Sequence, residues 1–554
     1  MTMRKLFEKY PVWWVLLLML ACLAPVMALR DFSPANELRY LSIADEALRD
    51  GHLFAFYNQG VPYADKPPLY IWIIMLCRLI FGEHSMFALS MFSFVPAAVI
   101  TLVMDKWVMG RRAAADRAAM AFMMSSTAMF LGMSVFLRMD MLMIMFDVLA
   151  LYAFRRGRKD RFAVFTFLAL FTKGPVGLLV PIVTVVVYIL SVRIAEWHRR
   201  KKPVAEGGAA SSESSDGQVI TRFGWWFGKN FWMIMLCCCA VWFLDVYLDG
   251  GKEYLNNLLF HQTVGRAVSS FHHSEPVWYY FVQIWPVLLP WSILCVGALA
   301  VSLFTLRRGV SEDEKIFLCV ILSTFVMLSC FSAKLSIYLA PIFPFAVYLV
   351  PMVTERTGWR KCMDWFVAVP LGVVALIGLV LGLAVLYLLV APERVVLAGL
   401  RSVDVPWAGV LPFLGGAICI VAAGLVLAGG SISAIVALFR RKAGIRAAIP
   451  FATGLLLCVL MVSPLMPVIN DYVGYGNLCR EIPEGETVYV RKVYRPENMD
   501  VYLGRDVVKI GADDPIPQDG VLVTKSKYRN EALDGRKRIV HGEYAVYLPL
   551  AKVR

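Results

Sequence analysis

Long apolar segments alternate with short polar ones from about residue 10 to residue 467. An α-helix needs roughly 20 predominantly apolar residues to cross the hydrocarbon core of a bilayer. A further apolar run at residues 68–82 is shorter and interrupted, so we expect a helix lying at the outer membrane interface. The pattern predicts a polytopic α-helical membrane protein with about thirteen transmembrane helices, at residues 13–29, 86–106, 117–137, 141–154, 162–173, 175–193, 228–247, 278–305, 316–332, 336–353, 364–390, 408–437 and 448–467.

The pattern changes after residue 467, where short β-favouring runs alternate with turn residues. We expect strands at 486–493, 507–510, 521–525 and 545–549. The chain therefore divides into a transmembrane domain at 1–467 and a small α/β domain at 468–554. Within the first domain, the segment 194–227 contains the run EGGAASSESSDGQ and is predicted to be a flexible cytoplasmic linker.

Composition agrees with a membrane protein, since 59% of the residues are hydrophobic and 17% are charged. The net charge of +14 could indicate a nucleic-acid partner. However, the basic residues concentrate in every second polar segment, as the positive-inside rule requires. The charge therefore reports topology rather than nucleic-acid binding. It places the N-terminus in the cytoplasm and the first outer loop, residues 30–85, on the opposite side. Because the expected number of helices is odd, the C-terminal domain is also extracytoplasmic.

Ionisable residues collect in the segments expected at the outer face, where charges are costly unless they are paired or hydrated. Some are cations suited to a phosphate, and others are carboxylates suited to taking a proton or binding a divalent metal. Together they favour group transfer from a phosphorylated lipid, or binding of such a lipid without turnover. The residues are Lys66, Arg138, Arg266, Lys334, Glu37, Asp65 and Asp140.

Six short motifs carry a more specific signal: NELRY at 36–40, YADKPP at 63–68, RMD at 138–140, TKGP at 172–175, PVWYY at 276–280 and SAKLSIY at 332–338. In their order and spacing they resemble the aminoarabinose transferase and protein O-mannosyltransferase superfamily. These are membrane glycosyltransferases of the C-type (GT-C) fold, and the resemblance extends over roughly residues 10–350. It implies a similar odd-span topology and location in a bacterial cytoplasmic (inner) membrane.

The resemblance also implies an activity. Members of the superfamily take a sugar from an undecaprenyl-phosphate or dolichyl-phosphate carrier at the outer face. They pass it, with inversion, to a hydroxyl or phosphate of an acceptor, which here would be lipid A, another glycolipid, a glycan or a protein. No nucleotide is required, and no nucleotide-binding GxxxxGK[ST] motif is present.

Carried over from that superfamily, Glu37 is the predicted base or acceptor-orienting residue. Many members have an acidic pair at this position, whereas this chain has Asn36 before Glu37, and an amide does not take a proton. Three alternatives follow: Glu37 is the base, Asp140 is the base, or the acceptor is already an anion. An inactive or purely binding homologue also remains open.

Lys66 matches the lysine that binds the donor phosphate in that superfamily, and its predicted helpers are Arg266, Lys334, Tyr338, Arg39 and Arg138. No cofactor is required by this scheme. A divalent metal is possible, and its candidate ligands are Asp65, His272 and His273, although adjacent histidines do not easily share one ion.

Three other functions are possible. A polymerase or ligase for surface polysaccharide would also be a transferase at the outer face, and only the family motifs argue against it. A flippase or transporter of a polyprenyl-linked sugar would show inverted repeats and broken helices at the membrane midplane, whereas the polar residues here gather at one face. A non-catalytic lipid-binding protein would use the same residues without turnover.

Overall fold

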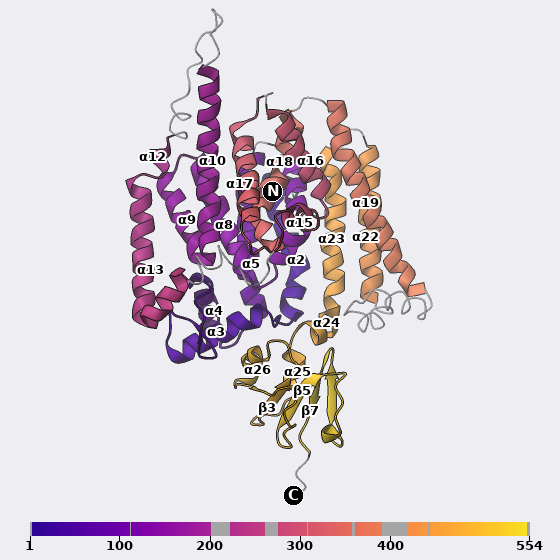
Figure 1. Ribbon diagram of the computed structural model, residues 1–554. Coiled ribbons are helices and arrows are strands. Elements are labelled where there is room, and N and C mark those ends of the chain that lie inside the picture. Colours follow the sequence, from indigo (N-terminus) through magenta and orange to yellow (C-terminus); the bar gives the residue numbers. More distant parts are fainter. Residues whose placement is uncertain are drawn as a thin grey trace, which may run out of the picture.

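The computed structural model describes residues 3–110, 112–200, 222–260, 275–306, 309–356, 360–390, 418–440 and 444–550. Most of the described chain is helical and forms one bundle, with a small sheet at one end (Figure 1). The bundle helices are α1 (Met3–Lys9), α2 (Pro11–Leu29), α5 (Met86–Met104), α6 (Ala114–Ser125), α7 (Ala128–Met133), α8 (Met139–Arg155), α9 (Lys159–Lys173), α10 (Pro175–Arg200), α12 (Phe223–Trp226), α13 (Lys229–Asn256), α15 (Tyr279–Val287), α16 (Ser292–Phe304), α17 (Glu312–Cys330), α18 (Phe343–Arg356), α19 (Arg360–Val390), α22 (Ile418–Phe439) and α23 (Ala448–Val462).

Eight helices in the described residues are long and apolar enough to cross a membrane. Their ranges are Pro11–Leu29, Met86–Met109, Pro175–His198, Lys229–Phe260, Ser336–Arg356, Val367–Tyr387, Ile418–Phe439 and Gly444–Val473. The predicted membrane protein with many spans is confirmed, but the count of about thirteen is not. The remaining predicted spans correspond to shorter or more charged helices, such as α8 and α17.

Two predicted spans are each broken into two helices. The span at 117–137 is interrupted between α6 and α7, where the Ser126 and Thr127 hydroxyls donate to carbonyls of the preceding turn. The span at 278–305 is interrupted between α15 and α16 at Pro290, which has no backbone N–H for a helical bond. The two interruptions meet, since the amide of Ala128 donates to the carbonyl of Leu289 at 2.7 Å.

Short helical segments continue or join the main helices. The π-helix η1 (Asp105–Met109) extends α5, and the 3₁₀-helix η4 (Ser336–Ile342) leads into α18. The 3₁₀-helix η6 (Gly444–Ala447) precedes α23, and η7 (Ser463–Leu465) follows it. Helix occupies both ends of the predicted linker 194–227, because α10 runs to Arg200 and α12 begins at Phe223; residues 201–221 between them lie outside the described residues.

The segment between α2 and α5 folds over the end of the bundle that faces the sheet (Figure 1). It contains α3 (Glu37–Asp50), the hairpin strands β1 (Tyr57–Asn58) and β2 (Val61–Pro62), and α4 (Leu69–Phe81). The helix expected at 68–82 is therefore present.

The C-terminal region is an α/β unit, as predicted. Helices α24 (Met466–Val473) and α25 (Gly476–Arg480) lead into a five-stranded sheet of order β4-β3-β5-β7-β6. Both β4 and β5 are parallel to β3, and β7 is antiparallel to β5 and β6. The strands and remaining helical turns are β3 (Val488–Arg491), η8 (Pro496–Met499), α26 (Asp500–Leu503), β4 (Val508–Lys509), β5 (Val521–Lys525), η9 (Glu531–Leu533), β6 (Arg538–His541) and β7 (Tyr544–Tyr547).

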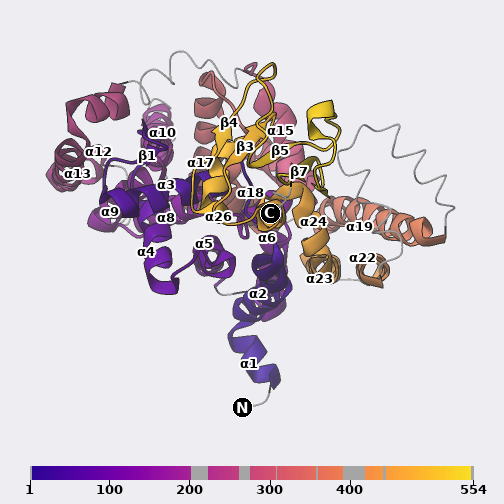
Figure 2. The same cartoon turned by 90° about the horizontal axis from the view of Figure 1, so that it is seen from below.

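The sheet lies across the end of the bundle near α3 (Figure 2). Buried valines of β3, β5 and β7 belong to the same hydrophobic cluster as Leu38 and Leu41 of α3. Polar contacts reinforce this packing: the amide of Gly476 donates to Asp31 at 2.6 Å, and the Ser42 hydroxyl donates to Asp500 at 2.6 Å. The sheet and the α3 segment therefore form one packed layer at this end of the molecule.

Candidate active site

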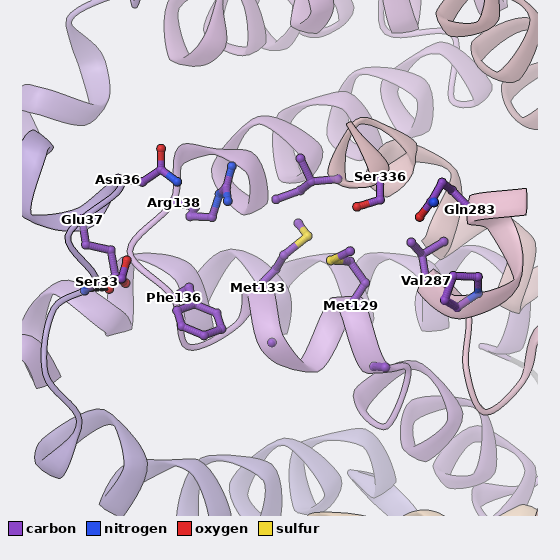
Figure 3. A pocket seen from close by; sticks show the side chains of 14 residues that line it. Ser33, Asn36, Glu37, Met129, Met133, Phe136, Arg138, Gln283, Val287 and Ser336 are labelled. Atoms are coloured by element: carbon purple, nitrogen blue, oxygen red, sulfur yellow. Dashed lines mark hydrogen bonds between the residues drawn. The ribbon is translucent and has the colours of Figure 1, made fainter. Parts of the chain in front are cut away.

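A cavity of about 540 Å³ opens beside α3, where the two helix interruptions meet. Figure 3 shows polar side chains at its two ends, with Asn36 and Arg138 at one and Gln283 at the other. Between them lie the apolar side chains of Met129, Met133 and other residues. Broken helices are tolerated at membrane depth where they line a cavity. The complete lining is Ser33, Asn36, Glu37, Ala128, Met129, Gly132, Met133, Phe136, Arg138, Gln283, Pro286, Val287, Ser336 and Ile337.

Glu37 lies at the N-terminus of α3 and is only 1% exposed. Arg30 binds its two oxygens through two nitrogens, at 2.6 and 2.8 Å. The backbone amides of Ser33 and Leu137 donate to the same carboxylate at 2.8 and 2.7 Å. An ionised carboxylate has about four acceptor positions, and these four bonds occupy them. Glu37 thus holds three segments together. Its role as a base stays a prediction, and these four bonds disfavour the uptake of a proton.

Asp140 lies in the first turn of α8 and is 2% exposed. One of its oxygens contacts the Lys173 ammonium at the end of α9, and the other accepts from Arg138 at 3.2 Å. The ammonium of Lys173 also lies 4.9 Å from the ring centroid of Tyr338. The motifs RMD, TKGP and SAKLSIY are therefore brought together into one cluster.

A second cluster joins α3 to the YADKPP motif. Arg39 donates to the Asn36 side chain at 3.2 Å, and its guanidinium lies 5.5 Å from the ring centroid of Tyr63. The Tyr63 hydroxyl donates to Asp65 at 3.4 Å, and Asp65 lies 3.5 Å from the Lys66 ammonium. Lys66 is therefore placed near Arg39 and Asp65, but it does not line the cavity.

Lys334 forms hydrogen bonds to the protein backbone that the sequence did not predict. Its ammonium donates to the backbone carbonyls of Glu275 and Phe331, at 2.8 and 2.6 Å, and the residue is only 3% exposed. Because two of its three protons are used there, Lys334 fixes the loop that carries Ser336 to the cavity.

Three predicted residues, Arg266, His272 and His273, lie outside the described residues. Among the residues that the structure describes, no group of three or more histidine, cysteine, aspartate or glutamate side chains could hold a metal ion. The proposed metal ligation by Asp65 with the two histidines thus stays a prediction.

One residue of the site, Arg30, was missed in the sequence. Arg30 follows α2 directly. Its place at the outer end of an apolar run, seven positions before Glu37, could have indicated an ion pair with Glu37. Tyr40 is 5% exposed and contacts Arg39 through its ring, at 5.7 Å from the guanidinium. Tyr40 belongs to the NELRY motif, but nothing in the sequence indicated that its side chain is buried.

Comparison with known proteins bears on this arrangement. The family model described as dolichyl-phosphate-mannose-protein mannosyltransferase, PMT_2, matches residues 65–211. An undecaprenyl phosphate-alpha-4-amino-4-deoxy-L-arabinose arabinosyl transferase of Pseudomonas aeruginosa (strain LESB58) is 25% identical over 337 residues, which are 58% of this chain and 55% of the relative. A transferase of the same name from Shewanella sediminis is 24% identical, over 52% of this chain and 49% of the relative. The chain thus spans about half the length of the curated relatives it matches.

The structural likeness covers nearly the whole chain. The crystal structure of ArnT from Cupriavidus metallidurans bound to undecaprenyl phosphate has a TM-score of 0.67 and 16% identity, and covers 97% of this chain and 98% of that one. The apo structure of the same protein gives 0.67 at 17% identity, covering 96% and 97%. These matches confirm the predicted resemblance: the chain has the GT-C fold of the ArnT structures, and its sequence is similar to aminoarabinose transferases and, over residues 65–211, to the protein mannosyltransferase family model.

Proposed function

We propose that this protein transfers a sugar from a polyprenyl-phosphate carrier to an acceptor at the outer face of a bacterial cytoplasmic membrane. One observation carries the proposal. A cavity with apolar walls and a polar end lies beside cations that come from α3, the YADKPP motif and the start of α8. A phosphorylated lipid needs this combination of surfaces, because its tail is apolar and its head is an anion.

In this proposal the lipid tail lies against Met129, Met133 and Val287 of the cavity. The phosphate lies at the end of the cavity formed by Asn36 and Arg138. Arg39 contacts Asn36 there, and Lys66 is connected to Arg39 through Asp65 and Tyr63. Arginine and lysine side chains are the usual partners of phosphate oxygens.

The reaction is a displacement at the first carbon of the sugar. The attacking oxygen of the acceptor forms a bond to that carbon while the bond to the carrier's phosphate oxygen breaks, so the configuration inverts. The leaving group is the polyprenyl phosphate, which keeps the bonding electrons. Arg39, Lys66 and Arg138 stabilise the negative charge that develops on it.

The carboxylates favour an acceptor whose attacking group is already an anion. Glu37 accepts four hydrogen bonds, and Asp140 is held between two cations, Arg138 and Lys173. Neither arrangement favours removal of a proton. A phosphate group on the acceptor, such as that of a phosphorylated glycolipid, would attack without a base, and Asn36 would then orient it.

The proposed topology follows from the same geometry. The site and the C-terminal sheet lie at one end of the bundle, and the basic segments of α8, α9 and α10 lie at the other (Figure 1). By the positive-inside rule, the basic end, with the chain's N-terminus, belongs to the cytoplasm.

The experiment is a transfer assay with purified protein and an undecaprenyl-phosphate sugar, in which released undecaprenyl phosphate is measured. Lys66→Ala should reduce release by at least about a hundredfold, because a charge-stabilising group typically contributes on that scale. The matched control is Arg49→Ala, which removes a cation from α3 whose side chain is 69% exposed.

Four results would contradict the proposal. Normal release by Lys66→Ala would remove the donor assignment. Movement of the intact donor across the vesicle membrane without release of the carrier would favour a flippase. Tight binding of the donor with neither movement nor release would favour a lipid-binding protein. Equal use of phosphorylated and dephosphorylated acceptors would remove the argument for an anionic acceptor.

A further inference from the structure

A second cavity, of about 420 Å³, lies at the opposite end of the bundle from the active-site cavity. It is built around the turn between α8 and α9, and the end of α5 closes one side. Arg138, which lines the first cavity, directly precedes α8, Arg156 directly follows it, and the helix has 17 residues. At a rise of about 1.5 Å per residue, the two cavities are separated by roughly 25 Å.

Four cations line this second cavity: Lys106, Arg156, Arg158 and Arg161. All four are exposed. Within the described part of the chain, no ion pair or hydrogen bond joins their side chains to a carboxylate. Neighbouring acids are already engaged, since Asp313 accepts from Trp107 at 2.8 Å and pairs with Arg155. Four like charges around one cavity repel each other unless an anion lies between them.

The walls of the cavity are apolar and aromatic. Val103, Leu149 and Phe165 line it, and the Arg156 guanidinium lies 5.1 Å from the ring centroid of Tyr152. Lys106 lies near the end of the candidate span Met86–Met109, so the cations lie at the level where a membrane helix leaves the hydrocarbon. A soluble anion would need no apolar wall at this depth.

We propose that this cavity binds the headgroup of an anionic phospholipid, with its phosphate between the four cations and the start of its acyl chains against the apolar wall. Basic pockets between membrane helices on the cytoplasmic side are suited to such headgroups. The volume lies within the range of small-molecule sites. The proposal is independent of the proposed function, because none of these residues belongs to the active site.

The test is native mass spectrometry of the full-length protein in detergent, with added dioleoyl-phosphatidylglycerol, dioleoyl-phosphatidylcholine or inorganic phosphate. The wild type should retain phosphatidylglycerol in preference to phosphatidylcholine. The double variant Arg158→Gln/Arg161→Gln should bind phosphatidylglycerol about 30-fold more weakly, since each basic residue near a membrane surface contributes about a fivefold factor in affinity.

The control Arg222→Gln/Lys229→Gln removes two exposed cations at the same end of the bundle that do not line the cavity, and it should bind within twofold of the wild type. Lys106→Gln, expected about fivefold weaker, replaces the double variant if that does not fold. Unchanged binding in the cavity variants would overturn the proposal. Equal retention of phosphatidylcholine, or displacement of the lipid by inorganic phosphate, would overturn the lipid assignment.

Discussion

Glu37 and Arg30 form an ion pair whose side chains are 1% and 7% exposed. Removing one partner of a buried pair leaves the other charge without compensation, which costs far more than the net contribution of the intact pair. The NELRY motif predicted that Glu37 acts as a base or orients the acceptor. The structure shows that its bonds connect the end of α2, the start of α3 and the loop before α8.

We therefore expect Arg30→Ala to lower the free energy of unfolding by about 3 kcal/mol, because it leaves the Glu37 carboxylate buried and unpaired. Arg49→Ala, which removes an exposed arginine, should change it by less than about 0.5 kcal/mol. Unfolding in detergent, followed by circular dichroism, measures both. If Arg30→Ala were as stable as the control, the positioning role of the pair would be wrong.

At the scale of elements, the sequence predicted most of the helices and four of the five strands of the C-terminal sheet, since apolar periodicity reports them directly. It missed β6, in which exposed and half-buried residues alternate without a strong apolar side. It also missed the breaks at Ser126–Thr127 and Pro290, because an apolar run continues through both. Those breaks create the cavity, so the walls of the site depend on contacts between segments far apart in the chain.

The hairpin of α9 and α10 was expected from sequence, and Gly177 makes its close packing possible. A Cβ at this position would lie 2.3 Å from the carbonyl oxygen of Ala169, which is backbone and cannot move aside. We expect Gly177→Ala to displace the end of α9 with Lys173, and to lower both the melting temperature and the transfer rate.

Gly429→Ala is the matched control, because a Cβ there would meet nothing within 4 Å. It should melt at or slightly above the temperature of the wild type, since alanine favours a helix interior over glycine. A Gly177→Ala protein with wild-type melting and activity would show that the hairpin can open without consequence.

At the scale of the whole molecule, the C-terminal sheet is attached to the α3 segment partly through Asp500. Burial raises the pKa of this carboxyl to about 6, and the Ser42 hydroxyl donates to it. A carboxyl with a raised pKa stabilises the folded state at pH values below its unfolded pKa. That stabilisation is lost as the pH rises through about 6.

We expect the attachment to weaken by about 2 to 3 kcal/mol between pH 4 and pH 7. The protection factors of the β3 and β5 amides against hydrogen exchange, taken relative to the intrinsic rate at each pH, measure this change. Asp500→Asn should remove most of the dependence and slow exchange at pH 7. The control Asp513→Asn, at an exposed position of the same domain, should keep the wild-type profile. Lower protection factors at pH 4 than at pH 7 in the wild type would contradict the stabilising role of protonated Asp500.

The proposed function depends on the cavity beside α3 being the place where the lipid donor binds. Undecaprenyl phosphate with a photoreactive group next to its phosphate tests this directly. After irradiation, peptide mapping should find the label on residues 128–138, which carry Met129, Met133 and Arg138, and excess undecaprenyl phosphate should suppress it. Labelling confined to α19 and α22, in a preparation that still releases the carrier, would contradict donor binding in this cavity.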